Sequence, residues 1–280
     1  MGTCNLTGEA TSPPWSRQEP TSFGECFHTI KNMTASRYGP WLAQWTEEIW
    51  SEHSLQLALR TVSFIETAPP LAPLRSLDLG CGTGRALEVF LQAGWDAEGL
   101  DESPDMLALA QKRLQRSPTP NQGRLHQGRI QEGLPKGPFN LITAFYNILN
   151  HLTSIEEIEQ VAAGIHRSLA PGGWFMGDLN TIRGFASWHE REIGPVQDWA
   201  LEVWRHYDPT SGRALLRVSG RRDTESFEEV ILNQAYETRA IADAFALAGF
   251  SQVGFAHPNA PDIVLLEPES LDRVLLKARI

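Results

Sequence analysis

Apolar residues recur at helical spacing from Pro40 to Ala68 and predict two helices ahead of the main core. Prolines end this pattern, and the apolar run Leu74–Leu79 then predicts a buried strand that stops at a glycine cluster. Beyond it, helical and extended patterns alternate. We expect helices at 85–93, 104–116 and 154–169 and strands at 97–100, 123–127, 140–145 and 173–179. Strands linked by helices of about ten residues or more predict parallel pairing through right-handed crossovers. The predicted fold class is therefore α/β, with a doubly wound, mostly parallel sheet.

The pattern changes after Asn180, where extended segments follow one another without helices between them. Turn residues join expected strands at 198–207, 213–222 and 226–237, which predicts a small antiparallel sheet. A helix at 238–248 ended by Gly249, and strands near 251–256 and 272–278, follow. The last strand is expected to join the main sheet in antiparallel orientation. We predict four parts: a flexible tail at 1–36, a core with N-terminal helices at 37–180, the antiparallel insertion at 181–237 and the rest of the core at 238–280.

Charge and cysteine content narrow the choice of partners. The 280-residue chain has 24 Lys and Arg against 34 Asp and Glu, a formal charge of −10 that would repel a nucleic-acid backbone. A small molecule is the better partner. Cys4, Cys26 and Cys81 are odd in number and lack zinc-site spacing, which indicates reduced thiols and a cytoplasmic location. No apolar run approaches the roughly 20 residues that cross a bilayer, so no membrane partner is expected.

The segment Asp78–Gly84, DLGCGTG, lies between a predicted strand and a predicted helix, where open α/β sheets bind ligands. Its glycines permit a tight turn and let a ligand approach the backbone. The dinucleotide fingerprint GxGxxG would need a third glycine where the chain has Arg85 or Leu87. Further on, Asp101 ends the second strand, where a carboxylate can accept both hydroxyls of a ribose. The two features predict an adenosine-type ligand and disfavour an NAD(P) dehydrogenase.

These residues resemble a known family. LDLGCGTG at 77–84 and GLDESPDML at 99–107 are similar to the two cofactor-binding motifs of class I methyltransferases, which use S-adenosylmethionine (SAM). FNLITAFYNILNHL at 139–152 and LAPGGWFMGDLNT at 169–181 resemble the family's fourth and fifth strands. The resemblance implies a Rossmann-like fold, with SAM as the methyl donor and S-adenosylhomocysteine as the product. It also implies membership of a subgroup that acts on small molecules and carries an antiparallel lid.

The resemblance further implies roles for individual residues. Asp78 would orient the amino group of SAM, Asp101 would hold the ribose, and Tyr38 would close over the cofactor. Glu102 and Met106 would flank the adenine. The glycine loop would line the methionine end of SAM with Gly80, Cys81, Gly82 and Gly84. Asp78 could instead cap the loop, Met106 could pack in the core, and Tyr38 could anchor a helix.

The chain departs from the family pattern after the third strand. Many relatives place an acid there for the adenine amino group, whereas this chain reads Gly128, Arg129, Ile130 and Gln131. The guanidinium of Arg129 cannot accept that hydrogen bond. A backbone contact at Arg129 or Ile130, or the side chain of Gln131, would take its place.

Methyl transfer is a displacement at a sulfonium, so alignment and desolvation can supply much of the catalysis and a base is optional. By resemblance, Phe145 faces the methyl group, and Tyr38 completes the catalytic site. His151 is the candidate base, since an imidazole titrates at about pH 6.5 and can take a proton from a hydroxyl or an ammonium. A packed histidine at a helix start is the alternative. Asp178 is a lone acid and does not predict a metal site.

Aromatic residues gather in and just before the predicted antiparallel sheet, which indicates a pocket for a flat or apolar acceptor. They are Phe185, Trp188, His189, Trp199, Trp204 and Tyr207. A core within the insertion, or a contact between copies in a homo-oligomer, would also account for them.

The function predicted from these features is SAM-dependent methyl transfer to oxygen or nitrogen of a small-molecule acceptor. Two alternatives stay open: a SAM-fold enzyme that uses the cofactor for other chemistry, and a protein that binds SAM without catalysis. The intact Asp78, glycine loop and Asp101 argue against the second.

Overall fold

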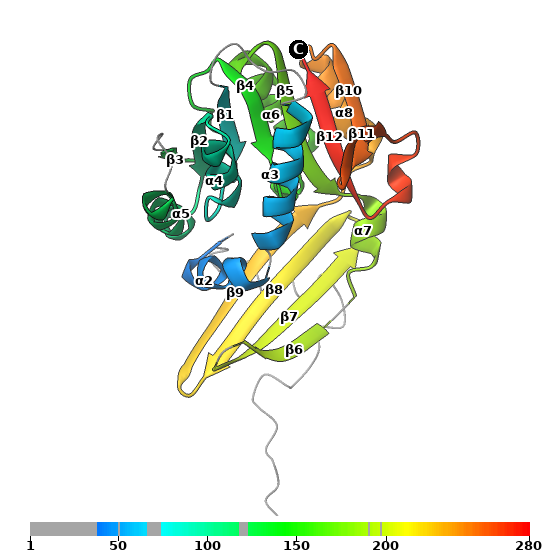
Figure 1. Cartoon of the computed structure of the whole chain (residues 1–280). Coiled ribbons are helices and arrows are strands. Elements are labelled where there is room, and N and C mark those ends of the chain that lie inside the picture. Colours follow the sequence, from blue (N-terminus) through cyan, green and yellow to red (C-terminus); the bar gives the residue numbers. More distant parts are fainter. Residues whose placement is uncertain (1–37, 50, 66–73, 118–122, 190, 197) are drawn as a thin grey trace, which may run out of the picture. The chain divides into compact units, whose positions relative to one another are not determined.

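The computed structural model describes residues 38–49, 51–65, 74–117, 123–189, 191–196 and 198–280. The predicted tail at 1–36 lies outside these residues. The first described elements are α2 (Pro40–Ile49) and α3 (Ser51–Ile65), which confirm the two expected helices. Strands and helices then alternate (Figure 1) as β1 (Arg75–Leu79), α4 (Arg85–Gln92), β2 (Asp96–Asp101), α5 (Pro104–Arg116), β3 (Arg124–Gln127), β4 (Phe139–Ala144), the 3₁₀ helix η1 (Ile148–His151), α6 (Ile155–Ser168) and β5 (Leu169–Asn180).

The second half of the chain adds a separate sheet and completes the first one. Its elements are α7 (Ile182–Ala186), β6 (Arg191–Val196), β7 (Trp199–Asp208), β8 (Arg213–Arg222), β9 (Glu225–Gln234), α8 (Thr238–Leu247), β10 (Gln252–His257), β11 (Ala260–Val264), the 3₁₀ helix η2 (Pro268–Ser270) and β12 (Arg273–Arg279). The sequence pattern does not indicate α7, β6 or β11, and it extends β9 by three residues beyond its end at Gln234.

Eight strands form the main sheet, in the order β11-β10-β12-β5-β4-β1-β2-β3. Neighbours from β5 to β3 are parallel, whereas β12 runs antiparallel to both β5 and β10. The strand order reverses between β1 and β4, and this reversal opens a crevice at the carboxyl ends of the strands. The predicted fold class is confirmed: a doubly wound, mostly parallel sheet with an antiparallel last strand, accompanied by a small antiparallel sheet.

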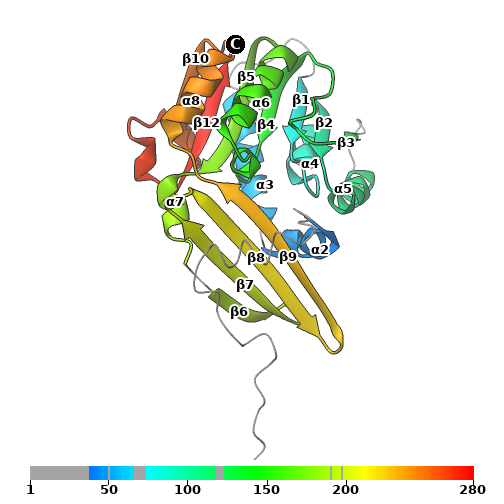
Figure 2. The ribbon, with the colours of Figure 1, turned by 180° about the vertical axis from the view of Figure 1, so that it is seen from behind.

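Helices cover both faces of the main sheet. Figures 1 and 2 show α3 and α4 on one face and α6 with α8 on the other. On the first face, Leu57 of α3 and Phe90 of α4 are buried in one hydrophobic cluster. On the second face, Ile158 and Ile165 of α6 share a cluster with Phe245 of α8. Because apolar side chains three or four positions apart lie on one side of a helix, each helix can bury a stripe against the sheet.

The second sheet is antiparallel, with strand order β6-β7-β8-β9. Its inner face packs against α2: Trp199, Val203 and Val218 share a buried cluster with Leu42 and Trp45. This contact connects α2 to the second sheet. The helix therefore rests on two parts of the fold, since α2 also contacts α5 and α3 of the main body.

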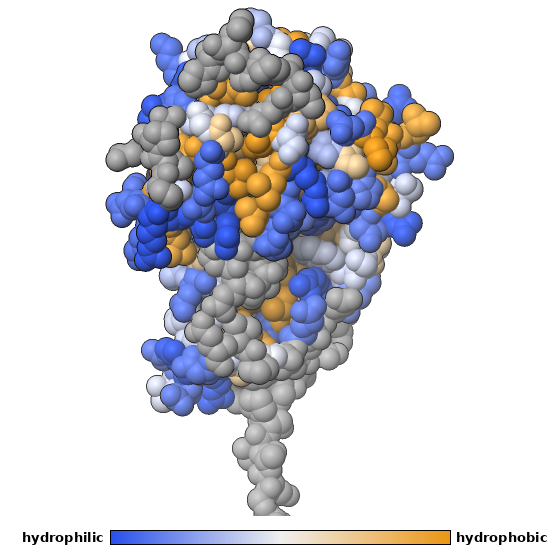
Figure 3. Space-filling view, in the orientation of Figure 1, coloured by the Kyte–Doolittle hydropathy of each residue, from blue (hydrophilic) through white to orange (hydrophobic). Residues whose placement is uncertain are grey.

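The outer strand β11 exposes apolar side chains at one end of the main sheet. Ile263 is 58% exposed, Val264 64% and Leu266, just beyond the strand, 94%. Figure 3 shows apolar side chains gathered at this end of the sheet. Within the described part of the chain, no helix combines the length and the hydropathy of a membrane span.

Candidate active site

The glycine loop joins β1 to α4. Its residues Gly80, Gly82 and Gly84 have φ angles of +64°, +52° and +80°, a left-handed region that glycine enters at little cost. The N–H groups of Gly80 and Cys81 both donate to the carbonyl of Leu100, at 2.7 and 3.1 Å. These bonds hold the loop against β2 at the carboxyl edge of the sheet.

Gly84 begins α4 and sits against α5. A Cβ at this position would lie 3.2 Å from the Cβ of Ala110, so glycine lets the two helices approach each other. Gly80, Cys81 and Gly82 instead line the cleft described below. Gly84 therefore has a packing role, and cofactor contact by the four loop residues remains a prediction.

Replacing Gly80 with Ala is expected to destabilise the protein more than the same change at Gly82. Both positions need a left-handed backbone, which costs an alanine about 1–2 kcal/mol. At Gly80 the new Cβ would lie 2.2 Å from Ile148 Cδ1, whereas at Gly82 the nearest atom is Met106 Sδ at 4.0 Å. Overpacking should add about 1–3 kcal/mol at Gly80 alone. Urea denaturation measures the difference; equal free energies of unfolding would contradict it, and Ile148→Ala should remove it.

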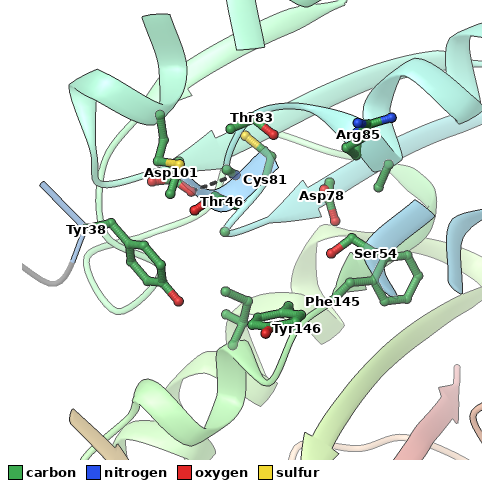
Figure 4. Close-up of a pocket in the computed structure, with 15 residues that line it drawn as sticks. Tyr38, Thr46, Ser54, Asp78, Cys81, Thr83, Arg85, Asp101, Phe145 and Tyr146 are labelled. Atoms are coloured by element: carbon green, nitrogen blue, oxygen red, sulfur yellow. Dashed lines mark hydrogen bonds between the residues drawn. The ribbon is translucent and has the colours of Figure 1, made fainter. Parts of the chain in front are cut away.

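Asp101 ends β2 directly beneath the loop. Its Oδ2 accepts the N–H of Gly82 at 2.8 Å (dashed line in Figure 4), and its Oδ1 accepts the N–H of Ser103 at 2.9 Å. Burial raises the pKa of Asp101 above its usual value, although the two hydrogen bonds oppose the rise. Each carboxylate oxygen has a second lone pair. Asp101 can therefore hold the loop in place and still accept two hydroxyls from a ligand.

Asp78 is a buried carboxyl on β1 that borders the same loop. Its Oδ1 accepts the hydroxyl of Thr143 at 2.6 Å. Burial raises the pKa of Asp78 to about 7, since the opposing hydrogen bond from Thr143 does not offset it and the charge of Asp101 adds to it. In Figure 4 the carboxyl group points into the cleft beside Ser54. A buried carboxyl that ionises near neutral pH is suited to pair with a cationic group of a ligand.

Two adjoining cavities lie over the carboxyl ends of β1, β2 and β4. The first encloses about 660 Å³ including its mouth, the second about 480 Å³, and Tyr38, Gly80, Asp101 and Ile148 line both. The first adds Thr46, Ser54, Asp78, Cys81, Gly82, Thr83, Arg85, Ala86, Met106, Phe145 and Tyr146, and the second adds Leu100, Glu102, Gly128, Arg129, Ile130, Gln131, His151 and Leu152. Every predicted cofactor contact except Gly84 thus borders this cleft.

The second cavity is lined by the residues that follow β3, among them Arg129, Ile130 and Gln131. Arg129 Nε lies 3.3 Å from Glu102 Oε2, and both side chains are partly exposed. The guanidinium therefore faces the acid that follows β2. Ile130 adds an apolar wall to the cavity, and Gln131 lines it as well. Which of these groups meets an adenine remains a prediction.

Tyr38 lies between the two cavities. Its carbonyl accepts the hydroxyl of Ser103 at 2.7 Å, and its ring meets the ring of His151 edge-on with centroids 5.8 Å apart. Figure 4 shows its hydroxyl directed toward the cleft. Burial, reinforced by the nearby hydroxyl of Tyr146 and the carboxylate of Asp101, raises the pKa of Tyr38 well above its usual value. The hydroxyl therefore stays protonated at neutral pH and serves as a hydrogen-bonding group.

His151 is a buried residue at the end of η1. Its Nδ1 lies 3.3 Å from the carbonyl of Leu232 on β9. A carbonyl can only accept, so the neutral ring carries its proton on Nδ1 and Nε2 is the basic nitrogen. His151 lines the second cavity beside Arg129, whereas Phe145 lines the first. Its role as a base remains a prediction.

A network that the sequence does not reveal fixes the turn after β4. Tyr146 and Asn147 have φ angles of 67° and 53°, which is rare outside glycine and concentrates at functional sites. Asp178, fully buried on β5, accepts the N–H of Tyr146 at 2.5 Å. Its other oxygen pairs with Arg273 and lies 3.1 Å from His53 Nε2. The three partners lie in the turn after β4, in β12 and in α3, so no sequence spacing connects them.

Asp178 is ionised despite its burial. Burial opposes ionisation, but the Arg273 guanidinium and the His53 ring hold the pKa of Asp178 below its usual range. Its role in the structure is to orient the turn that carries Tyr146 into the first cavity. Among the residues described, no cluster of three or more His, Cys, Asp or Glu side chains could hold a metal ion.

The aromatic residues near the inserted sheet mostly pack with one another. Trp199 belongs to the cluster beneath α2, and Phe185 and Tyr207 form another with Ala214. Trp204 stacks on His206, with ring centroids 5.4 Å apart. Packing against α2 accounts for Trp199, and a small core beside the second sheet accounts for Phe185 and Tyr207. A contact of the aromatic residues with an acceptor remains a prediction.

The fold and the loop define the class of protein first: a Rossmann-like α/β protein with a glycine-rich ligand loop at the carboxyl edge of its sheet. Residues 77–173 match the family described as a methyltransferase domain. The match runs from β1 into β5 and includes the glycine loop and Asp101.

Two of the curated relatives are amino-sugar methyltransferases. A dTDP-4-amino-2,3,4,6-tetradeoxy-D-glucose N,N-dimethyltransferase of Saccharopolyspora spinosa is 28% identical over 75% of this chain and 87% of its own length. A dTDP-3-amino-3,4,6-trideoxy-alpha-D-glucopyranose N,N-dimethyltransferase of Streptomyces venezuelae is 34% identical, over 35% of this chain. That second match spans only 38% of the relative's length.

Solved structures share the fold at low identity. The CcbJ methyltransferase of Streptomyces caelestis superposes with a TM-score of 0.72 and 17% identity, over 87% of this chain and 97% of its own. A SAM-dependent methyltransferase of Clostridium acetobutylicum superposes with a TM-score of 0.68 and 14% identity, over 92% and 98%. In each comparison the shared fold covers most of this chain and most of the solved structure.

Proposed function

We propose that the chain transfers the methyl group of SAM to an oxygen or nitrogen of a small-molecule acceptor. The observation that carries this proposal is the placement of two acids, Asp78 and Asp101, on either side of the glycine loop. Both line the first cavity, and Asp101 also lines the second. The first carboxyl suits an ammonium group and the second suits the hydroxyls of a ribose. An adenosyl amino acid presents both, whereas the pyrophosphate of a dinucleotide would be repelled by the two acids.

Each residue of the cleft would have a role that follows from its position. When bound, SAM supplies a methyl group attached to a positively charged sulfur. Asp78 would anchor the amino-acid end of the ligand and Asp101 its ribose, and Tyr38 would cover the ligand between the cavities. Phe145 and Tyr146 would exclude water from the acceptor side, where alignment of the two reactants accounts for much of the rate.

The acceptor is proposed to be an amino or hydroxyl group of a small molecule. Two curated relatives whose names specify amino sugars support an amine as the first choice, and two ubiquinone biosynthesis O-methyltransferases support a hydroxyl as the second. The chain's formal charge of −10 supports a small molecule over a nucleic acid. We propose the cytoplasm as the location of the protein. Cys81 is a buried free thiol, which is consistent with a reducing compartment.

An assay with methyl-labelled SAM tests this function. The full chain would be incubated with dTDP-amino sugars and with the matched sugars that carry a hydroxyl in place of the amine, and products would be separated by mass. Transfer to either set supports the proposal and decides between nitrogen and oxygen. Tight binding of S-adenosylhomocysteine without transfer to any acceptor in a broad panel would favour a protein that binds SAM without catalysis.

Replacing His151 with Gln is expected to lower kcat by about 10²–10⁴ with little change in SAM affinity, if the imidazole removes a proton. The amide approximates the size of the ring and removes the basic Nε2 of an imidazole whose Nδ1 faces the Leu232 carbonyl at 3.3 Å. The measurement is kcat as a function of pH for both proteins. A variant with full activity and an unchanged profile would return His151 to a packing role.

A further inference from the structure

Glu229 on β9 binds the segment that carries Tyr38. Its Oε2 accepts the N–H groups of Gly39 and Leu42 at 3.0 and 3.1 Å, and its Oε1 accepts the N–H of Trp41 at 3.0 Å. The intervening residue is a proline and has no N–H. One carboxylate therefore takes every backbone donor from Gly39 to Leu42.

This arrangement is a helix cap supplied from a distant strand. The first N–H groups of a helix lack partners within the helix and are usually capped by a neighbouring side chain. Here the cap lies 187 to 190 residues away in the chain. Gly39 and Leu42 are buried and Glu229 is only 7% exposed, so water cannot readily replace the carboxylate.

The opposite side of Tyr38 is tied to the cofactor loops. Ser103 donates its hydroxyl to the Tyr38 carbonyl, and the Ser103 N–H donates to Asp101. The backbone around Tyr38 is therefore held on one side by the loop that follows β2 and on the other by the carboxylate of Glu229. Since its side chain lines both cavities, a shift of α2 would open the cleft at its centre.

The same strand contacts the other side of the cleft. The Leu232 carbonyl faces His151 Nδ1 at 3.3 Å, Asn233 accepts from the Asn147 amide at 2.9 Å, and the Gln234 carbonyl accepts from the Asn150 amide at 2.9 Å. Strand β9 thus holds both the segment before α2 and the segment after β4. Its position fixes both of these walls of the cleft.

We propose that Glu229 is a positioning residue that holds Tyr38 over bound SAM, so that the inserted sheet controls release of the cofactor. The inference rests on the proposed use of the cleft for SAM. Loss of the carboxylate should leave the other cleft residues in place and free the segment that carries Tyr38. The cofactor should then dissociate faster.

A double-mutant cycle tests the connection between Glu229 and Tyr38. Glu229→Gln has nearly the same shape but places an NH₂ group against backbone donors, and should raise the dissociation rate of S-adenosylhomocysteine and lower its affinity about ten- to a hundredfold. Tyr38→Ala should have a similar effect, and the double variant should lose little more than either one. The matched control is Glu228→Gln on the other face of β9, where the side chain lies 3.9 Å from Arg217.

The outcomes separate the two proposals. If the wild-type protein does not bind S-adenosylhomocysteine, the proposed function fails. If it binds and Glu229→Gln binds equally well, or if the Glu229 and Tyr38 losses multiply, the inference is overturned. Should Glu229→Gln fail to fold, hydrogen exchange in the wild type decides: ligand binding should protect the amides of Gly39, Trp41 and Leu42, and unchanged exchange there would reject the connection.

Discussion

Asp101→Ala should weaken binding of S-adenosylhomocysteine by about 30- to 1,000-fold, the largest loss expected from any single change in the cleft. The estimate corresponds to about 2–4 kcal/mol for removing two charge-assisted hydrogen bonds to a ribose. Calorimetric titration measures it. The control is Asp96→Asn at the other end of β2, where the carboxylate pairs with Arg124 at 3.0 Å and should leave binding unchanged.

A second ligand distinguishes the ribose role from a collapse of the loop. Asp101 also accepts the N–H of Gly82, so its removal could loosen the segment that contacts the amino-acid end. Methylthioadenosine contains the ribose and lacks the amino acid. If Asp101 holds the ribose, affinity for this ligand should fall as much as affinity for S-adenosylhomocysteine. Wild-type affinity of Asp101→Ala for methylthioadenosine would contradict the ribose role.

The second large effect is a dependence of cofactor affinity on pH that originates at Asp78. Burial raises the pKa of this carboxyl to about 7 in the free protein, so it is mostly protonated below that pH. Pairing with the ligand ammonium requires the carboxylate. Affinity for S-adenosylhomocysteine should therefore fall by about tenfold for each pH unit below 7, which is 1.36 kcal/mol per unit.

Two comparisons assign that dependence to Asp78. Asp78→Asn should bind more weakly at pH 8 and lose most of the dependence. Methylthioadenosine, which has no ammonium group, should show only what other groups such as Asp101 contribute. Parallel pH profiles for the two ligands on the wild-type protein would show that Asp78 does not meet the ammonium group.

Stability should change with pH in the opposite direction. A carboxyl whose pKa is higher in the folded protein than in the unfolded chain binds more protons when folded, so stability falls as pH rises between the two values. For Asp78 this interval runs from the ordinary value of 3.8 to about 7. Asp78→Asn should therefore stabilise the ligand-free protein at pH 8 relative to wild type. The buried Asp78 therefore gives the site a carboxylate for the ligand and lowers the stability of the ligand-free protein.

The elements with strong local patterns could be predicted from the sequence. The bounds of α5 and β8 agree with the expectation to the residue, because helical periodicity, a capping serine and clear turns frame them. The pattern does not indicate β6 and β11 because each contains a proline, Pro195 and Pro261, which argues against a strand. Helix α7 has only five residues and contains Gly184, so its periodicity cannot be read.

The same contrast applies to the cleft. The glycine loop and Asp101 lie within 24 residues of chain, from 78 to 101, and their spacing carries the resemblance to the family. Asp178, Arg273 and His53 meet only because β5, β12 and α3 converge in space. Glu229 reaches Gly39 across 190 residues. Side chains that act through such long-range contacts leave no local pattern in a single sequence.

The measurement that tests the central claim most directly is a calorimetric titration of the wild-type protein with S-adenosylhomocysteine and, separately, with NADH. The cleft around Asp78 and Asp101 predicts micromolar binding of the first ligand and none of the second. Binding of NADH in place of S-adenosylhomocysteine, or no binding of either, would mean that the glycine loop does not hold SAM.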